Sequence, residues 1–312
     1  MTQLQILLGD CREQMRTLAD GSVQTCVTSP PYFGLRDYGH DGQLGLETTP
    51  DDFVAAMVEV FREVHRVLAD DGTLWLNLGD SYASSPRGNK PGDISTSSLT
   101  NPKRQDSVER GRIDTSKASG LAHKQLIGIP WRVAFALQAD GWYLRQDIIW
   151  HKPNPMPESV TDRCTKAHEY IFLFSKKPKY FYDANAVKEP EVCGRKRGPA
   201  LHADTKSTNG NGGLARRESD GFRNRRSVWT VTTKPFKGAH FATFPPELIE
   251  PCVLAGSRLG DTVLAPCGGS GTTAGVAIKH GRKAVLCELN PEYAALVPNR
   301  IASIVGDGWD LL

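Results

Sequence analysis

The order of apolar and polar positions in the first quarter of the chain predicts a strand–helix–strand unit. Apolar runs at residues 3–8 and 23–28 predict two strands, the first short and buried and ended by Gly9-Asp10. Between residues 53 and 68, large apolar side chains recur every three or four positions, which predicts a helix. Thr49-Pro50 supplies its start and Asp71-Gly72 its end. Residues 74–78 then predict the next strand, and this rhythm is typical of a parallel sheet covered by helices.

The remainder of the chain continues this rhythm, with two interruptions. Helices are predicted near 126–139, from about 246, after residue 271 and after Asn290-Pro291, and strands near 143–151, 170–174, 262–264 and 283–287. Residues 84–120 are rich in Ser, Gly, Pro, Lys and Arg, which predicts a mobile surface loop. A second polar, Gly- and Arg-rich insertion covers residues 187–228.

Composition narrows the class of protein. The 312 residues contain no apolar run of about 18 residues and no basic stretch followed by an apolar one, so we expect a cytoplasmic protein without a membrane partner. The seven cysteines include no C-x-x-C pair, and the eight histidines form no H-E-x-x-H pattern. A structural metal or a disulfide framework is therefore not expected.

Charge is concentrated in one segment. The chain carries a net charge of +3, but residues 188–237 contain 12 Lys or Arg against 5 Asp or Glu, a net charge of +7. The rest of the chain is therefore mildly acidic. This distribution indicates either a local contact with a polyanion or a solvated basic loop, and charge alone does not separate the two.

A glycine-rich turn near the C-terminus predicts a cofactor site. Gly268-Gly269-Ser270-Gly271 lies between a predicted strand and a predicted helix, where glycines allow a tight turn and close approach to a ligand. Ser270, Thr272 and Thr273 can cap the new helix, and Glu288 ends the next strand, where an acid can hold ribose hydroxyls. The dinucleotide and P-loop patterns are absent, which favours an adenosyl cofactor over a phosphate-rich one; a purely structural turn remains the alternative.

The run Thr28-Ser29-Pro30-Pro31-Tyr32 predicts a site for an amino group. Two prolines fix the backbone after a strand, so the Pro30 carbonyl can point rigidly into a pocket. That carbonyl and the Ser29 hydroxyl can accept hydrogen bonds from an exocyclic NH2. Tyr32 offers a face on which an extruded base can stack.

These motifs resemble the β group of amino-directed DNA methyltransferases, in which a [DNS]-P-P-[YF] element precedes a D-P-F-x-G-S-G-T element. The resemblance extends over most of the chain and includes Gly9-Asp10, residues 75–80 (WLNLGD), 147–157 (DIIWHKPNPMP), 168–172 (HEYIF) and 244–261. It implies a Rossmann-like, S-adenosylmethionine-dependent α/β fold with a mainly parallel seven-stranded sheet, helices on both faces and a loop-rich insertion. Residues 1–183 and 237–312 would form the two halves of one domain, and residues 184–236 the target-recognition segment.

The resemblance also implies a role for each matched residue. Ser29, Pro30, Pro31 and Tyr32 would hold the target base. The cofactor would be bound by Asp10, Phe244, Pro245, Ala265, Cys267, Gly268, Ser270, Gly271, Thr272, Thr273 and Glu288. Double-stranded DNA would be contacted by Arg195, Lys196, Arg197, Arg216, Arg217, Arg223, Arg225 and Arg226. Ala265-Pro266-Cys267 departs from the Asp-Pro-Phe of the family, which puts cofactor affinity in doubt.

The expected reaction is direct methyl transfer to a flipped base. Serine at position 29 favours N4 of cytosine within the family, and N6 of adenine is the alternative. A catalytically inactive DNA-binding protein and an enzyme acting on structured RNA are further alternatives. A Pro-Cys nucleophile for C5 methylation is disfavoured, because Pro251-Cys252 falls in a predicted helix and Pro266-Cys267 in the cofactor turn. A homodimer and a separate restriction endonuclease are compatible partners.

Overall fold

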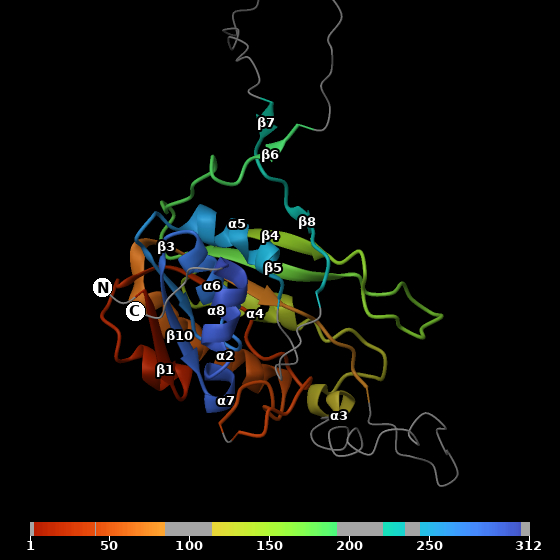
Figure 1. The fold of residues 1–312 in the computed structure, drawn as a ribbon. Coiled ribbons are helices and arrows are strands. Elements are labelled where there is room, and N and C mark those ends of the chain that lie inside the picture. Colours follow the sequence, from red (N-terminus) through yellow and green to blue (C-terminus); the bar gives the residue numbers. More distant parts are fainter. Residues whose placement is uncertain (1–2, 41, 85–113, 192–220, 235–243, 307–312) are drawn as a thin grey trace, which may run out of the picture.

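A single eight-stranded sheet organises the chain in the computed structural model, which describes residues 3–40, 42–84, 114–191, 221–234 and 244–306 (Figure 1). In spatial order the strands are β1 (Leu4–Leu8), β10 (Lys283–Glu288), β9 (Thr262–Ala265), β2 (Val23–Thr28), β3 (Leu68–Leu78), β5 (His168–Ser175), β4 (Tyr143–His151) and β8 (Val228–Thr230). Only β5 runs antiparallel to its neighbours among these strands. The mainly parallel sheet expected from the sequence is confirmed, and the three-residue β8 extends it at one edge.

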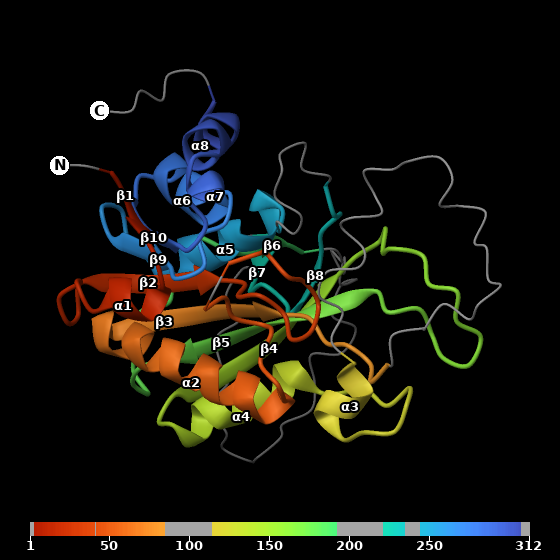
Figure 2. The ribbon, with the colours of Figure 1, turned by 90° about the horizontal axis from the view of Figure 1, so that it is seen from below.

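Helices cover both faces of this sheet, as Figure 2 shows. The helices are α1 (Cys11–Met15), α2 (Pro50–Val67), α3 (Thr115–Ser119), α4 (Ile129–Ala139), α5 (Pro246–Gly256), α6 (Thr272–Lys279), α7 (Pro291–Ala294) and α8 (Val297–Val305). Buried side chains of α1, α2 and α4 form one hydrophobic cluster with the sheet, and those of α5, α6 and α8 form the other. Each fully buried side chain such as Phe53 or Ile301 stabilises the fold by about 1.5–3 kcal/mol before entropy is subtracted.

Helix α2 begins where the sequence predicted it but ends earlier. The hydroxyl of Thr49 accepts a 3.1 Å hydrogen bond from the amide of Asp52, and Pro50 occupies the first turn. The helix ends at Val67, earlier than the predicted stop at Asp71-Gly72. Leu68 instead begins β3, where it is fully buried and pairs with Val23, so sheet pairing overrides the helical periodicity.

Three further expectations need correction. The first strand, expected to be buried, lies at the sheet edge, and Leu8 is 54% exposed. The expected last helix is split into α7 and α8, with Pro298 in the first turn of α8. Within the predicted mobile loop 84–120, residues 85–113 lie outside the described residues, but Thr115–Ser119 form α3, which the side chain of Asp114 caps.

The basic insertion is described only at its two ends. Glu189–Pro190 (β6) and Phe222–Arg223 (β7) form a separate two-stranded antiparallel sheet that stands away from the main sheet in Figure 1. From β7 the chain returns through β8 to the edge of the main sheet. None of the described helices is long and apolar enough to span a bilayer.

Candidate active site

A cavity of about 480 Å³ opens at the carboxyl ends of the parallel strands. Residues that directly follow β1, β2, β9, β10 and β4 line it, which is where ligands bind in open α/β sheets. Its volume suits a small molecule together with part of a second ligand. It contains both the Ser-Pro-Pro-Tyr element and the glycine turn, so the structure brings together the two motifs that are far apart in the sequence.

One end of the cavity is built around Glu288. Its Oε2 accepts a 2.6 Å hydrogen bond from the amide of Gly269, and its Oε1 accepts a 2.9 Å bond from the amide of Asn290. Burial raises the pKa of Glu288, while these backbone bonds act in the opposite direction. A carboxylate has about four acceptor positions, so Glu288 can also accept hydrogen bonds from hydroxyl groups of a ligand.

The glycine turn is held tightly between the sheet and α8. A side chain at Gly268 would contact Leu286 and the carbonyl of Cys287, and one at Gly271 would meet Val297 at 2.8 Å. Gly271 also has a φ of 91°, a left-handed conformation that favours glycine. Its role is therefore to pack the turn against α8, and it does not line the cavity.

The three hydroxyl residues of this turn do not cap α6, contrary to the sequence prediction. Gly271 occupies the cap position, and no side chain bonds there. Thr273 instead donates to the carbonyl of Val27 at 3.2 Å, and Thr272 accepts a 3.2 Å bond from Nε of Arg300. Ser270 is 2% exposed and lines the cavity, and its hydroxyl has no hydrogen-bond partner among the described residues. A buried hydroxyl in this state is a ready partner for a ligand.

Cys267 forms an apolar part of the wall where the resembled family carries phenylalanine. A hydrogen bond with Cys11, together with burial, keeps the pKa of the Cys267 thiol well above its usual range. Cys11 and Cys287 line the same wall. Ala265 lies in β9, is 1% exposed and belongs to the core.

Asp10 lines the cavity but is already engaged. Its carboxylate accepts hydrogen bonds from the amide, Nε and Nη2 of Arg12, and these contacts lower its pKa. Both oxygens of Asp10 therefore have a protein partner. Arg12 thus holds the Asp10 carboxylate in place at the cavity, and a ligand donor could bind only to its remaining lone pairs.

The other end of the cavity is built on the Ser-Pro-Pro-Tyr element, and Ser29, Pro30, Pro31 and Tyr32 all line it. The Tyr32 ring packs so closely on Gly79 that a side chain at position 79 would meet Cε2 of Tyr32 at 2.5 Å. The hydroxyl of Ser29 donates to that of Tyr32 at 3.4 Å. Burial, followed by the nearby charge of Glu169, raises the pKa of Tyr32 well above its usual range, so the phenol stays protonated.

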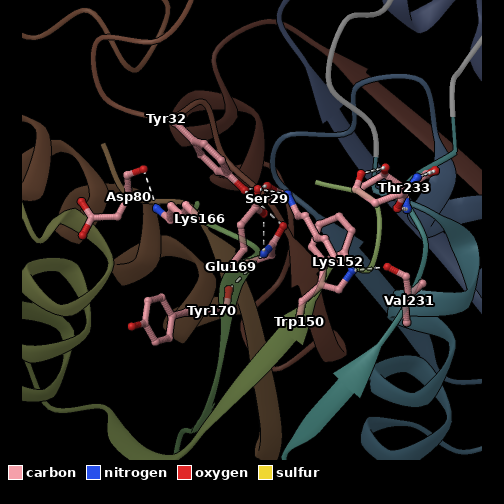
Figure 3. A network of polar contacts seen from close by, with 12 residues as sticks. Ser29, Tyr32, Asp80, Trp150, Lys152, Lys166, Glu169, Tyr170, Val231 and Thr233 are labelled. Carbon is pink, nitrogen blue, oxygen red and sulfur yellow. Dashed lines mark hydrogen bonds and ion pairs between the residues drawn. The ribbon is translucent and has the colours of Figure 1, made fainter. Parts of the chain in front are cut away.

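Glu169 joins this end of the cavity to a polar network, shown in Figure 3. Its Oε2 accepts a 2.8 Å bond from Tyr32 and a 3.2 Å bond from Nδ2 of Asn77. Its Oε1 pairs with Lys152, whose ammonium lies 4.2 Å from the centroid of the Trp150 ring. All four of these partners line the cavity. Sequence reasoning gave none of Asn77, Trp150, Lys152 and Glu169 a role, although each falls in a run that carries the resemblance.

The structure places most of the predicted cofactor residues at this cavity. Those that line it are Asp10, Phe244, Cys267, Gly268, Ser270, Thr272, Thr273 and Glu288. Three do not: Ala265 is in the core, Gly271 packs on α8, and Pro245 lies at a neighbouring surface hollow between the start of α5 and α8. Among the described residues, no group of three or more His, Cys, Asp and Glu side chains could hold a metal ion.

The predicted DNA-binding cations are only partly described. Arg195, Lys196, Arg197, Arg216 and Arg217 lie outside the described residues. Arg223 and Arg226 both pair with Oε1 of Glu189, at 2.9 and 2.7 Å, and Arg225 lies 4.6 Å from the centroid of the Trp229 ring. These contacts fix the described ends of the basic insertion, residues 187–228, which we call the basic arm. Arg226 itself remains 64% exposed.

Comparison with known proteins gives matches over nearly the whole chain. The profile of the N6/N4 methyltransferase family, described as DNA methylase, matches residues 23–299. Type II methyltransferase M.Cfr9I of Citrobacter freundii is 50% identical over 293 residues, 94% of this chain and 86% of that one. Type II methyltransferase M.SmaI of Serratia marcescens is 46% identical over 299 residues, 95% of this chain and 90% of that one.

Solved structures share the fold. The PvuII DNA methyltransferase, described as cytosine-N4-specific, superposes with a TM-score of 0.64 at 18% identity, covering 100% of this chain and 89% of that one. A putative DNA modification methylase of Thermus thermophilus, complexed with S-adenosyl-L-methionine, superposes with a TM-score of 0.57 at 23% identity, covering 98% of this chain and 97% of that one.

Proposed function

Since this chain belongs to the N6/N4 family of DNA methylases, we propose that it transfers a methyl group from S-adenosylmethionine to N4 of cytosine in double-stranded DNA. The observation that carries the proposal is the single cavity shared by the Ser-Pro-Pro-Tyr element and Glu288. A reaction between two bound molecules needs both binding sites within reach of each other.

The residues at the Glu288 end fit S-adenosylmethionine. Glu288 can accept the two ribose hydroxyls, and the unpaired hydroxyl of Ser270 can bond to the charged amino-acid end of the cofactor. The neutral thiol of Cys267 gives an apolar wall in place of the family's phenylalanine. When bound, this cofactor supplies an electrophilic methyl group on a sulfonium.

The residues at the other end fit a flipped base. The Ser29 hydroxyl can accept a hydrogen bond from the exocyclic amino group, which orients the nitrogen lone pair toward the Glu288 end of the cavity. Tyr32, held by Gly79 behind it, offers a fixed ring beside the base. The prolines between Ser29 and Tyr32 restrict the backbone, so little reorganisation is needed on binding.

Methylation of an amino group also releases a proton, and the network provides a path for it. The hydrogen bonds run in one direction, from Ser29 to Tyr32 at 3.4 Å and from Tyr32 to Glu169 at 2.8 Å. Ser29 can take the proton from the nitrogen as it passes its own to Tyr32, and Tyr32 passes its proton to Glu169. Lys152 pairs with Glu169 and so holds the carboxylate in place for this exchange.

Cytosine N4 is proposed as the target because serine stands at position 29, where other members of the resembled group carry aspartate or asparagine. Residues 1–183 and 237–312 are proposed as the two halves of the catalytic domain, and residues 184–236 as the segment that recognises the DNA sequence. As the relatives are described as type II methyltransferases, we propose that a separate restriction endonuclease accompanies the enzyme in its host.

Modification mapping tests the proposal. The chain is expressed in cells that lack N4-methylcytosine, and their DNA is read for modified bases, with a Ser29→Ala variant as the control. We expect N4-methylcytosine at one recurring sequence motif in the wild-type sample alone. N6-methyladenine at the motif would replace the cytosine assignment with adenine, and unmodified DNA would contradict the activity.

A further inference from the structure

The loop that joins β4 to β5, residues 152–167, extends from the edge of the sheet at which the cavity opens (Figures 1 and 2). Its two ends are bonded together, since the amide of Lys152 donates to the carbonyl of Ala167 at 2.8 Å. The side chain of Asn154 exchanges hydrogen bonds with the backbone of Thr233, at 3.0 and 3.1 Å. The start of the loop is therefore fixed to the segment that returns from the basic arm.

The outer part of the same loop is also braced. Oε2 of Glu158 accepts hydrogen bonds from Nη1 of Arg163 at 2.7 Å and from the amide of Lys166 at 3.0 Å. Asp162 pairs with Lys124 at 2.6 Å, which ties the loop to the segment before α4. The Arg163 guanidinium lies 4.1 Å from the centroid of the Tyr82 ring. These contacts tie the outer part of the loop to its own backbone, to Tyr82 and to the segment before α4.

This braced loop presents one apolar side chain to water. Met156 is 87% exposed, the highest value among the large hydrophobic side chains in the described part of the chain, and it also lines the cavity. It stands between Pro155 and Pro157, each of which fixes its own φ and restricts the residue before it. A methionine side chain gains about 1.5–3 kcal/mol when it is fully buried, so a partner that covers Met156 would be bound more tightly through this contact.

We propose that Met156 enters the DNA base stack when the target base leaves it, and fills the space that the base vacates. The inference rests on the proposed function, which requires a base to be extruded into the cavity. Apolar side chains, methionine included, are known to insert between base steps, and a thioether is polarizable and packs well against aromatic rings. Met156 lies at the cavity, so the base and the side chain that replaces it would exchange over a short path.

The test compares two DNA duplexes built on the motif found by modification mapping. In one the target base is fully paired, and in the other an abasic site lies opposite it, which removes the pairing that flipping must break. Initial rates of methyl transfer are measured for wild type, Met156→Ala, Met156→Leu and Leu259→Ala. Leu259 is a matched control because it is 78% exposed and precedes the amino end of β9, whereas the cavity opens at the carboxyl ends of the parallel strands.

The inference predicts a loss that depends on pairing. For Met156→Ala we expect a rate about 10-fold lower on the paired duplex and within about 2-fold of wild type on the abasic one. Met156→Leu keeps an apolar side chain and should stay within about 3-fold of wild type on both duplexes. Leu259→Ala should match wild type throughout.

Two results would overturn the inference while leaving the proposed function intact. One is a Met156→Ala rate equal to wild type on the paired duplex, and the other is an equal loss on both duplexes. Failure of wild type to methylate either duplex would instead overturn the proposed function, and the inference with it.

Discussion

The hydroxyl of Tyr32 donates a 2.8 Å hydrogen bond to Oε2 of Glu169, a residue 137 positions further along the chain. This bond links the strand end that carries the Ser-Pro-Pro-Tyr element to the start of the antiparallel strand β5. Glu169 is itself fixed by Asn77 and Lys152. The position of the Tyr32 ring, and the proposed route for the released proton, both depend on this contact.

Glu169→Gln tests that route. The amide keeps the size of the side chain but is a poor proton acceptor, so we expect kcat to fall by about 100-fold, within the range for general acid–base catalysis. Cofactor affinity, measured by calorimetry, should not change, because Glu169 lies at the base end of the cavity. Glu63→Gln is the matched control: it removes a carboxylate that pairs with Arg66 on α2 and should leave kcat unchanged. A Glu169→Gln enzyme with wild-type kcat would exclude the route.

Ser270→Ala tests the cofactor end. The Ser270 hydroxyl is buried without a partner among the described residues, so the bond we propose forms only with the cofactor. We expect the Kd for S-adenosylmethionine to rise about 5- to 10-fold, the scale of one net hydrogen bond of about 1 kcal/mol. The stability of the free protein should be unchanged or slightly higher, because an unsatisfied buried hydroxyl is removed.

Thr28→Val is the control for this measurement. Thr28 is 1% exposed and its hydroxyl also has no partner among the described residues, but it does not line the cavity. Its replacement should leave the Kd within about 2-fold of wild type, since no ligand contact is lost. An equal loss of affinity in both variants would mean that Ser270 acts through packing.

The pKa of Glu288 makes cofactor binding sensitive to acid. Burial raises this pKa above the usual 4.5, and the ionised carboxylate is the form that accepts two ribose hydroxyls. Affinity should therefore fall as the pH drops through the raised pKa, by about tenfold per pH unit below it. Calorimetry from neutral pH to below 4.5, the usual pKa of the group, measures the effect, and a flat profile over that whole range would argue against ribose binding at Glu288.

The same shift has the opposite sign for the stability of the free protein. Folding favours the protonated form of Glu288, so its contribution to the free energy of unfolding is fully present below the usual pKa. That contribution is lost as the pH rises through the raised pKa. Through Glu288, a falling pH should therefore increase the free energy of unfolding of the free protein and weaken the binding of the cofactor.

Several parts of this site follow from local pattern alone. The glycine turn and the Ser-Pro-Pro-Tyr element were each predicted as a site from their own residues, and they meet in one cavity because the carboxyl ends of parallel strands share one edge of a sheet. Glu169 was not predicted, because β5 runs antiparallel to its neighbours. The start of β5, where Glu169 lies, is therefore beside the carboxyl ends of the parallel strands. Gly271 was misplaced for a different reason: its tight contact with Val297 depends on α8, which no local pattern reveals.

Arg226→Ala tests the described part of the basic arm. Arg226 is 64% exposed and shares Glu189 with Arg223, so its removal should leave the arm fixed by the remaining ion pair. If Arg226 contacts a DNA phosphate, affinity should weaken for all sequences alike, and the slope of log K against log salt should decrease by about 1. An unchanged slope would place Arg226 outside the DNA interface.

The central claim is that this cavity methylates N4 of cytosine, and analysis of the product nucleoside tests it most directly. Purified enzyme is incubated with DNA and S-adenosylmethionine that carries a labelled methyl group, and the DNA is digested to nucleosides and analysed by mass spectrometry. The account predicts labelled N4-methyldeoxycytidine from wild type and at most a trace from Ser29→Ala. Label recovered only in N6-methyldeoxyadenosine, or in no nucleoside at all, would contradict it.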